Sequence, residues 1–332
     1  MQGLLSRRQA LALVTALSAS LASFGALIGN AHAQTAAPAN PAELRIGFQK
    51  YGTLTVLKAK GDLEKRLAPL GITVKWTEFP AGPQLLEGLN VGSIDFGTVG
   101  EAPPIFAQAA GADLVYVANQ PPAPTAEALV VPKDSPIRTL ADLKGKKIAL
   151  NKGSNVHYLL VKLLEKQGLK YSDIQVVYLP PADARAAFER GAVDAWVIWD
   201  PFLAAAERQL GARVVADGQG VVANHQFYLA ARTYADKHPQ VIQAIVDELA
   251  KLDRWSQANT GAVAALLAPQ IGLDVSTTEL AATRFSYGIQ LITPAIAAEQ
   301  QKIADAFHAL KLIPKPIRIA DALPKTVRTA AK

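Results

Sequence analysis

Short apolar runs alternate with segments of helical periodicity from residue 44 onward. A buried strand is typically an apolar run of about four to eight residues, whereas a helix places apolar residues three and four positions apart. The first series of predicted strands covers residues 44–48, 72–76, 95–99, 114–117 and 129–131, and the predicted helices between them cover 56–67, 83–89 and 104–109. Strands separated by helices predict an α/β fold with largely parallel sheets.

Pro132 and Pro136 interrupt this pattern, and a second series of alternating elements follows. Its predicted strands cover residues 147–150, 174–179, 195–199 and 213–215, and its predicted helices cover 156–167, 182–190 and 201–210. After a last strand at 227–230 the pattern is helical to the end, and residues 238–259 form the longest predicted element.

The two series share one local motif. Residues 92–95 (GSID) and 191–194 (GAVD) each stand between a predicted helix and a predicted strand. In both, glycine can end the helix in the left-handed conformation and aspartate opens the strand. This agreement favours two lobes of similar fold, and such sheets bind ligands at the carboxyl ends of their strands. The loops at 100–104 and 200–201 are therefore the first candidates for a binding site.

Composition limits the classes of function that remain. The chain has 332 residues, of which 50% are hydrophobic and 19% charged, as is typical of one large folded domain or two medium ones. Cysteine is absent, which excludes disulfides, thiolate metal ligands, a thiol nucleophile and a lipid-anchored N-terminal cysteine. The formal net charge is +6, but no run of five basic residues occurs. A solvated surface of mixed charge is therefore favoured over a nucleic-acid-binding face.

The N-terminus has the pattern of a cleavable export signal. Arg7 and Arg8 precede an uncharged stretch at 10–28, and the small residues Ala31 and Ala33 follow it. Polar and small residues dilute the stretch, which argues against a membrane span. We expect residues 1–33 to be a signal peptide, cleaved near Ala33 to leave a soluble protein outside the cytoplasm. The residues around Arg7 fit the twin-arginine pattern only in part, so general secretion and twin-arginine export both stay open.

One segment has the composition of an anion site. Gly153, Ser154 and Asn155 follow a predicted strand and begin a predicted helix. Backbone N–H groups at a helix start are unpaired and carry partial positive charge, glycine permits close approach, and the serine hydroxyl can donate a hydrogen bond. The alternative is that Ser154 only caps its helix.

Other candidate residues have structural explanations of equal weight. Trp199 ends a predicted strand, where an aromatic side chain can wall a cleft or pack into the core. Asp200 and Glu101 stand where carboxylates begin helices, a role that needs no ligand. The histidines at 157, 225, 238 and 308 lack metal-ligand spacing, and no Gly-x-Ser-x-Gly elbow is present. The sequence therefore predicts no metal site, no cofactor and no catalytic machinery.

Several runs resemble one known family over nearly all of the chain beyond the export signal. They are LRIGFQK (44–50), EFPAGPQ (78–84), LNVGSID (89–95), PPIFAQAAGADLVYV (103–117), ADARAAF (182–188) and WDP (199–201). These runs resemble the aliphatic sulfonate-binding proteins of bacterial ABC importers.

The resemblance implies an α/β periplasmic binding protein of type II, with two mainly parallel sheets in two lobes and a ligand cleft between them. Lobe one would hold residues 43–132 and 230–325, and lobe two residues 133–229. Such a protein, expected as a monomer, delivers a small sulfonate anion to a cognate ABC permease and its ATPase in the inner membrane. Carried over by position, the resemblance implies ligand contacts at Gln49, Thr98, Gly100, Glu101, Gly153, Ser154, Asn155, Trp199 and Asp200, with Phe227 as a further candidate.

The sequence departs from the family pattern at residues 51–53, 155–156 and 224–226, which leaves the contacts of the ligand's tail open. Receptors for taurine, nitrate and bicarbonate share the fold and stay alternatives, because Glu101 or Asp200 could receive the ammonium group of taurine. Enzymes of this fold rely on cysteine, which this chain lacks, and a pure interaction module would bind no small anion.

The candidate loops offer neutral hydrogen-bond donors, with Lys50 as the only cation nearby in the sequence. A dianion would need a paired cation, whereas a monoanion needs only partial positive charge. We therefore expect short alkanesulfonates to bind well and sulfate to bind weakly. We also expect affinity to change little between mildly acidic and neutral pH.

Overall fold

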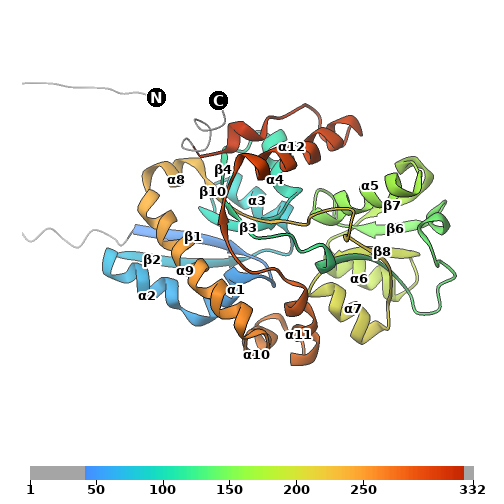
Figure 1. The fold of residues 1–332 in the computed structure, drawn as a ribbon, viewed down its shortest axis with the longest axis horizontal. Coiled ribbons are helices and arrows are strands. Elements are labelled where there is room, and N and C mark those ends of the chain that lie inside the picture. The colour runs from blue at the N-terminus through green and yellow to red at the C-terminus, as the bar shows by residue number, and fades with distance from the viewer. Residues whose placement is uncertain (1–41, 325–332) are drawn as a thin grey trace, which may run out of the picture. The chain divides into compact units, whose positions relative to one another are not determined.

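The computed structural model describes residues 42–324. The predicted signal peptide and the residues up to 41 lie outside this part of the chain, as does residue 325 of the predicted lobe one. The described residues form two sheets, one six-stranded and one five-stranded, with helices around each (Figure 1). The predicted α/β class with two sheets is confirmed.

The six-stranded sheet has the order β11-β4-β10-β3-β1-β2. Its strands are β1 (Ala42–Phe48), β2 (Ile72–Glu78), β3 (Phe96–Gly100), β4 (Leu114–Asn119), β10 (Gln226–Ala231) and β11 (Gln290–Leu291). The five-stranded sheet has the order β7-β6-β8-β5-β9. Its strands are β5 (Glu127–Val131), β6 (Lys147–Leu150), β7 (Gln175–Tyr178), β8 (Ala195–Trp199) and β9 (Arg213–Asp217).

Helices occupy most of the remaining described chain. Those of the first half are α1 (Thr53–Lys60), α2 (Asp62–Leu67), α3 (Gly82–Asn90), α4 (Pro103–Ala109) and α5 (Asn155–Gln167). Those of the second half are α6 (Pro181–Glu189), α7 (Phe202–Leu210), α8 (Arg232–Lys237), α9 (Pro239–Ala258), α10 (Thr260–Ile271), α11 (Val275–Arg284) and α12 (Pro294–Ala309). Short 3-10 turns lie at Ala68–Leu70, Pro124–Ala126, Leu140–Leu143, Tyr171–Asp173 and Ile319–Ala322.

Two predicted elements differ from the structure. The helix expected at 56–67 is two helices, because Gly61 separates α1 from α2 with a φ of 64°, in the left-handed region that glycine adopts without steric cost. β11 interrupts the helical region expected after residue 230 and pairs with β4. A strand of two residues is too short to show the alternation of apolar and polar residues from which a strand is predicted.

β5 and β10 run against the other long strands of their sheets. β10 is antiparallel to β3 and to β4, whereas β1 is parallel to β2 and to β3. β5 is antiparallel to β8 and to β9, whereas β6 is parallel to β7 and to β8. Both sheets are therefore mixed, and the parallel arrangement that the sequence predicts holds for the remaining long strands.

The two reversed strands fix where the chain passes between the sheets. β5 belongs to the five-stranded sheet and β10 to the six-stranded sheet, so the passages are residues 120–126 and 218–225. The crossings expected near Pro132 and Ala230 are thereby corrected, since Pro132 follows β5 and Ala230 lies inside β10. The run QPPAP at 120–124 marks the first passage better than Pro132 does, because proline does not continue a central strand.

The two passages are hydrogen-bonded to each other. The N–H of Gln120 donates to the carbonyl of Gln226 at 2.8 Å, and the N–H of Ala123 donates to the carbonyl of Ala223 at 3.0 Å. The two sheets are therefore connected by two short segments that are hydrogen-bonded to each other.

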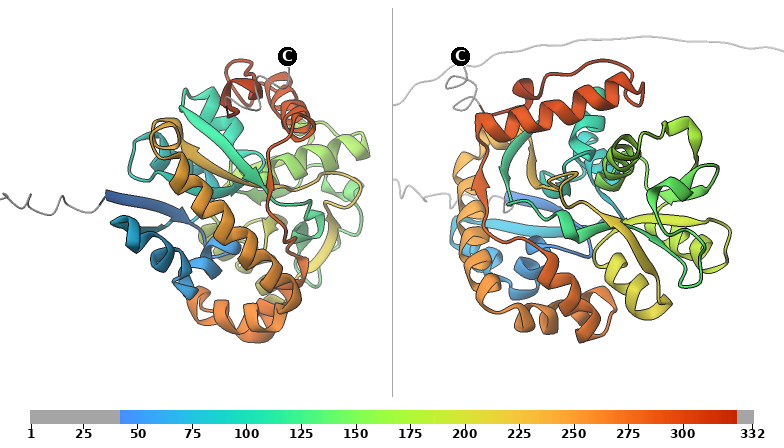
Figure 2. Two further views of the ribbon diagram at one scale, coloured as in Figure 1. Left: turned by 60° about the vertical axis from the view of Figure 1, so that its left-hand side comes forward. Right: turned by 45° about the vertical axis from the view of Figure 1, so that its right-hand side comes forward.

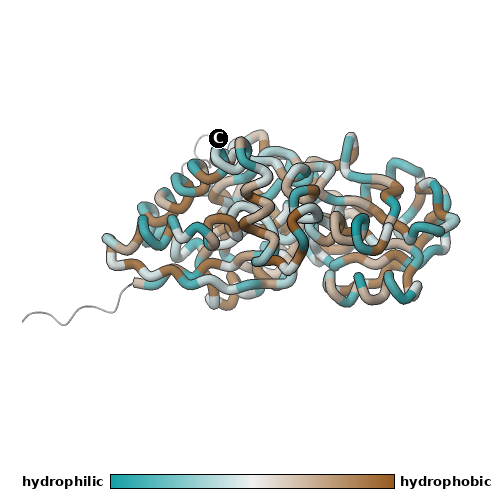
Figure 3. The backbone as a smooth tube through the Cα atoms, turned by 90° about the horizontal axis from the view of Figure 1, so that it is seen from below, coloured by the Kyte–Doolittle hydropathy of each residue, from teal (hydrophilic) through white to brown (hydrophobic). Residues whose placement is uncertain are grey.

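Buried apolar side chains form one group around the five-stranded sheet and one on each face of the six-stranded sheet. Tyr228 and Leu229, neighbours in β10, belong to different groups, as the alternation of a strand requires. Figure 2 shows α9, in orange, lying along one side of the six-stranded sheet, where Ile245 packs in the same group as Ile46. In Figure 3 the apolar, brown stretches run through the interior.

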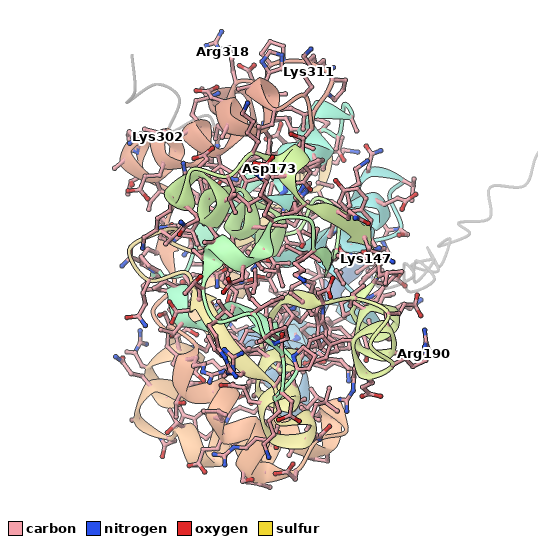
Figure 4. The ribbon with its side chains drawn as sticks, turned by 90° about the vertical axis from the view of Figure 1, so that its right-hand side faces the viewer. Lys147, Asp173, Arg190, Lys302, Lys311 and Arg318 are labelled. Carbon is pink, nitrogen blue, oxygen red and sulfur yellow. The ribbon has the colours of Figure 1, made fainter. Side chains whose placement is uncertain are left out.

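Six charged side chains at the periphery of the described chain show how its surface charge is distributed. Figure 4 labels Lys147, Asp173, Arg190, Lys302, Lys311 and Arg318, which are spread over several elements instead of forming one basic face. Among residues 42–324, no helix combines the length and the apolar composition that a bilayer span requires.

Candidate functional site

A cleft lies where strands of both sheets end. Gln49 follows β1, Gly100 ends β3, and Trp199 ends β8, while Asn155 is the first residue of α5. The residues that line the cleft are Gln49, Tyr51, Gly52, Thr53, Gly82, Thr98, Gly100, Pro103, Gln120, Asn155, Trp199, Gln226, Tyr228 and Phe285. This lining contains no charged side chain.

Three helices begin at the cleft and have backbone N–H groups in their first turn. They are α1 at Thr53, α3 at Gly82 and α5 at Asn155. The first N–H groups of a helix have no partner within it and together carry partial positive charge. The cleft therefore offers backbone donors and helix dipoles to an anion.

Gln49 and Thr98, both predicted contacts, lie on one side of the cleft. The side-chain amide of Gln49 donates to the carbonyl of Thr98 at 3.1 Å, and the Thr98 hydroxyl donates to the carbonyl of Phe227 at 3.2 Å. These bonds hold both side chains against β3 and β10.

Asn155 approaches the cleft from the other sheet. Its side-chain amide donates to Glu127 at 2.5 Å and to Asn224 at 3.0 Å. A Cβ on Gly100 would lie 2.9 Å from the Asn155 side chain, so the two halves of the cleft meet closely here and Gly100 leaves the necessary space.

Ser154 and Gly153 do not line the cleft. The Ser154 hydroxyl is buried and donates to the carbonyl of Asn151 at 2.7 Å. The N–H of Gly153 donates to the ring of His157 at 3.2 Å, and its Cα faces Phe106. The loop thus turns these two residues inward, and Asn155 is the member of the motif that reaches the cleft.

Glu101 and Asp200 are buried outside the lining of the cleft. Glu101 accepts the N–H of His225 at 3.0 Å, and Asp200 accepts the N–H of Ala204 at 2.9 Å. Burial raises the pKa of Glu101 to about 7 and likewise the pKa of Asp200 to about 7, although Arg284 opposes the shift of Asp200. Asp200 thus bonds to the first turn of α7, as expected for a carboxylate at a helix start, and it also pairs with Arg284 at 3.6 Å. Glu101 instead bonds to the backbone of a distant segment, beside β10.

Phe227 faces away from the cleft and packs edge-on against Tyr116, with ring centres 5.2 Å apart. Because side chains alternate along a strand, its neighbours Gln226 and Tyr228 face the cleft instead. The same alternation, applied to the sequence, could have identified them.

Other lining residues had weaker signals in the sequence. Tyr51 packs edge-on against Phe285, from α11's end, with ring centres 4.9 Å apart. Only the fold brings these two residues together. Gln120 opens the proline-rich passage, and Thr53 begins α1.

A second cavity adjoins the cleft and shares Gln49, Tyr51 and Trp199 with it. Its other lining residues are Lys50, Glu78, Phe79, Pro80, Pro180, Pro181, Ala182, Pro201 and Phe202. Lys50 and Glu78 form an ion pair of 3.8 Å among these otherwise mostly apolar residues. Trp199 thus separates a polar cleft from a mainly apolar cavity.

No cluster of histidine, aspartate and glutamate suited to a metal ion occurs among the residues that the structure describes. Two mixed α/β sheets, two linking passages and a cleft at the strand ends are the features of the two-lobed fold found in periplasmic binding proteins.

The chain belongs to the NMT1-like family, whose model matches residues 37–268. A curated relative from Escherichia coli (strain K12), named for the binding of aliphatic sulfonates, is 48% identical over 287 residues, covering 86% of this chain and 89% of the relative. The solved periplasmic aliphatic sulphonate binding protein SsuA of Escherichia coli is 46% identical with a TM-score of 0.78, covering 86% of this chain and 92% of that chain.

The alkanesulfonate-binding protein SsuA of Xanthomonas axonopodis pv. citri, solved with bound MOPS, is 43% identical with a TM-score of 0.81. The match covers 86% of this chain and 99% of that chain. These relatives are substrate-binding proteins of transport systems and not enzymes, in agreement with the family and the non-enzymatic role that the sequence predicted.

Proposed function

We propose that this protein is the periplasmic receptor of an ABC importer and captures aliphatic sulfonates for sulfur acquisition. The observation that carries the proposal is a cleft with three helix starts, neutral donors and no charged lining residue. A sulfonate carries one negative charge on three acceptor oxygens, which helix starts and neutral donors can satisfy. Sulfate would bring a second charge without a paired cation, which is costly in a closed cleft.

The tail of the sulfonate would pass Trp199 into the adjoining cavity. Phe79 and Phe202 supply apolar surface there, and each buried CH₂ contributes up to about 0.8 kcal/mol. A longer alkyl chain should therefore bind more tightly until the cavity is filled.

Taurine is the second candidate, since it carries the same sulfonate with an added ammonium group. Glu101 and Asp200, the carboxylates considered for that ammonium, accept backbone N–H groups and do not line the cleft, and Asp200 is also paired with Arg284. Glu78 lines the adjoining cavity but is paired with Lys50. This arrangement favours an alkanesulfonate over taurine.

Calorimetry on the protein without its export signal tests the proposal. The ligands are methanesulfonate to hexanesulfonate, with sulfate, nitrate and taurine as comparisons. We expect affinity to rise with chain length and sulfate to bind weakly or not at all. Sulfate binding as tightly as the best sulfonate would contradict the argument from an uncharged lining, and no binding by any of these anions would favour an interaction module.

We further propose a monomer that closes on its ligand and docks on a cognate permease and its ATPase in the inner membrane. Residues 42–119 and 226–324 would form lobe one and residues 127–217 lobe two, in keeping with the strand order. Solution scattering should give a monomer whose radius of gyration falls at saturating ligand. N-terminal sequencing of the periplasmic fraction should find a start near Gln34, and Met1 retained in a membrane fraction would contradict export by cleavage.

A further inference from the structure

Asp253 lies on α9 behind the cleft and does not line it. Its side chain is buried and accepts hydrogen bonds from three separate segments of the chain. We propose that Asp253 is a positioning residue, which sets the geometry of the anion site through Thr53 and Gln120. The proposal rests on the proposed function, in that the ligand is an anion bound in the cleft.

Two of these donors are side chains that line the cleft. The Thr53 hydroxyl donates to Asp253 at 2.9 Å, and the Gln120 amide lies 3.3 and 3.4 Å from the two carboxylate oxygens. The same Gln120 amide donates to the Thr53 hydroxyl at 2.7 Å. Asp253 therefore fixes both side chains in one triangle of hydrogen bonds.

The third segment is the chain that leads to β11. The N–H groups of Gly288 and Ile289 donate to Asp253 at 3.0 and 2.8 Å. The carboxylate thus joins α9, this loop, the start of α1 and the first passage between the sheets.

The hydroxyl of Thr53 is already engaged before any ligand binds. The hydroxyl hydrogen of Thr53 is donated to Asp253 and is therefore not available to the anion. Thr53 instead contributes to the site through its backbone position at the start of α1. Preorganised N–H groups bind an anion more strongly than groups that must reorient, because the cost of ordering is already met. An amide in place of the carboxylate would lose acceptor capacity and leave one of the buried donors unpaired.

Asp253→Asn tests the inference, with Asp95→Asn as the matched control. Asp95 is a buried aspartate that accepts from Arg45 at the opposite end of β3 from Gly100, so its loss should affect stability alone. Hexanesulfonate affinity is measured by calorimetry below both unfolding transitions. We expect Asp253→Asn to weaken binding about tenfold, the effect of one lost hydrogen bond to a charged group, and Asp95→Asn to leave it within about twofold.

A second pair of variants keeps the test decisive if Asp253→Asn does not fold. Thr53→Val removes the hydroxyl that contacts Asp253 with little change in volume, whereas Thr53→Ser retains it. We expect Thr53→Val to weaken binding and Thr53→Ser to keep the affinity of the wild type, although the hydroxyl is not itself a donor to the anion. Equal affinity for the two variants would overturn the inference.

A double-mutant cycle adds a measurement that general destabilisation would not change. If Asp253 acts through Gln120, the affinity loss from Gln120→Ala should be smaller in the Asp253→Asn background than in the wild type. Additive losses would overturn the inference. Absence of binding by the wild type, in contrast, would refute the proposed function and is recorded before any variant is compared.

Discussion

Gly100→Ala should weaken ligand binding more than it destabilises the ligand-free protein. The added Cβ would lie 2.9 Å from Cβ and Cγ of Asn155, nearer than non-bonded carbon atoms approach one another. Asn155 cannot move away freely, because its amide is bonded to Glu127 and Asn224. Gly100 ends a strand of the six-stranded sheet, whereas Asn155 begins α5, which packs against the five-stranded sheet. The clash therefore opposes the close approach of the two halves of the cleft.

The size of the effect follows from the cost of overpacking. One inserted methyl group in a packed site costs about 1–3 kcal/mol, which corresponds to an affinity loss of about fivefold to 150-fold. If the protein opens without ligand, this cost falls on the bound form alone. Calorimetry with hexanesulfonate measures the affinity, and thermal unfolding without ligand measures the stability.

Gly97→Ala is the matched control on the same strand. Its Cβ would lie 2.7 Å from Leu85, and both residues belong to the six-stranded sheet and its covering helix α3. We expect this variant to lose thermal stability and to keep its affinity once folded. Unchanged affinity in Gly100→Ala would show that Gly100 and Asn155 do not approach each other in the bound state.

Two other substitutions separate the tail of the ligand from its anionic group. Full burial of one CH₂ group raises affinity by up to about fourfold, and Trp199→Ala should reduce this gain for each CH₂ added to the ligand. If the gain in affinity per CH₂ from methanesulfonate to hexanesulfonate is unchanged, the tail lies elsewhere. Ser154→Ala should leave affinity unchanged and lower stability by about 1 kcal/mol, because its hydroxyl donates to the Asn151 carbonyl inside the loop. A loss of affinity without a loss of stability would restore Ser154 as a ligand contact.

Most strands and helices could be predicted because their apolar patterns are local. β6 and β8 were expected at the bounds that the structure gives, 147–150 and 195–199. The reversal of β5 and β10 could not be predicted in this way, because an apolar run reads the same in either direction. Strand direction depends on pairing partners distant in sequence.

The cleft was predictable only in part for the same reason. The loops after β3 and β8 were predicted from the rule that ligands bind at strand ends, and Gln49 after β1 was implied by the family resemblance. Which side chain of a loop turns inward depends on neighbours that the sequence does not reveal, as Ser154 and its bond to Asn151 illustrate. Phe285 comes from the end of α11 and joins the cleft only through the tertiary fold.

Buried carboxyls near the cleft revise the expectation that affinity is independent of pH. Burial raises the pKa values of Glu101 and Asp200 to about 7, and it raises the pKa of Glu127, which accepts from Asn155, well above its usual range. Below pH 7, Glu101 and Asp200 are mostly protonated and add little negative charge. Above pH 7 they ionise, and each new charge repels an anion bound nearby.

Sulfonate affinity should therefore fall as pH rises from 6 to 8, although the sulfonate itself stays a monoanion. Stability should fall over the same range, because a group whose pKa is raised in the folded state binds more protons there than in the unfolded chain. Glu101→Gln should weaken both dependences, whereas Glu87→Gln on the exposed face of α3 should leave them unchanged. Calorimetry and thermal unfolding at pH 6, 7 and 8 provide the measurements. Equal wild-type affinities at pH 6 and 8 would show that these carboxyls do not change their charge near the bound anion.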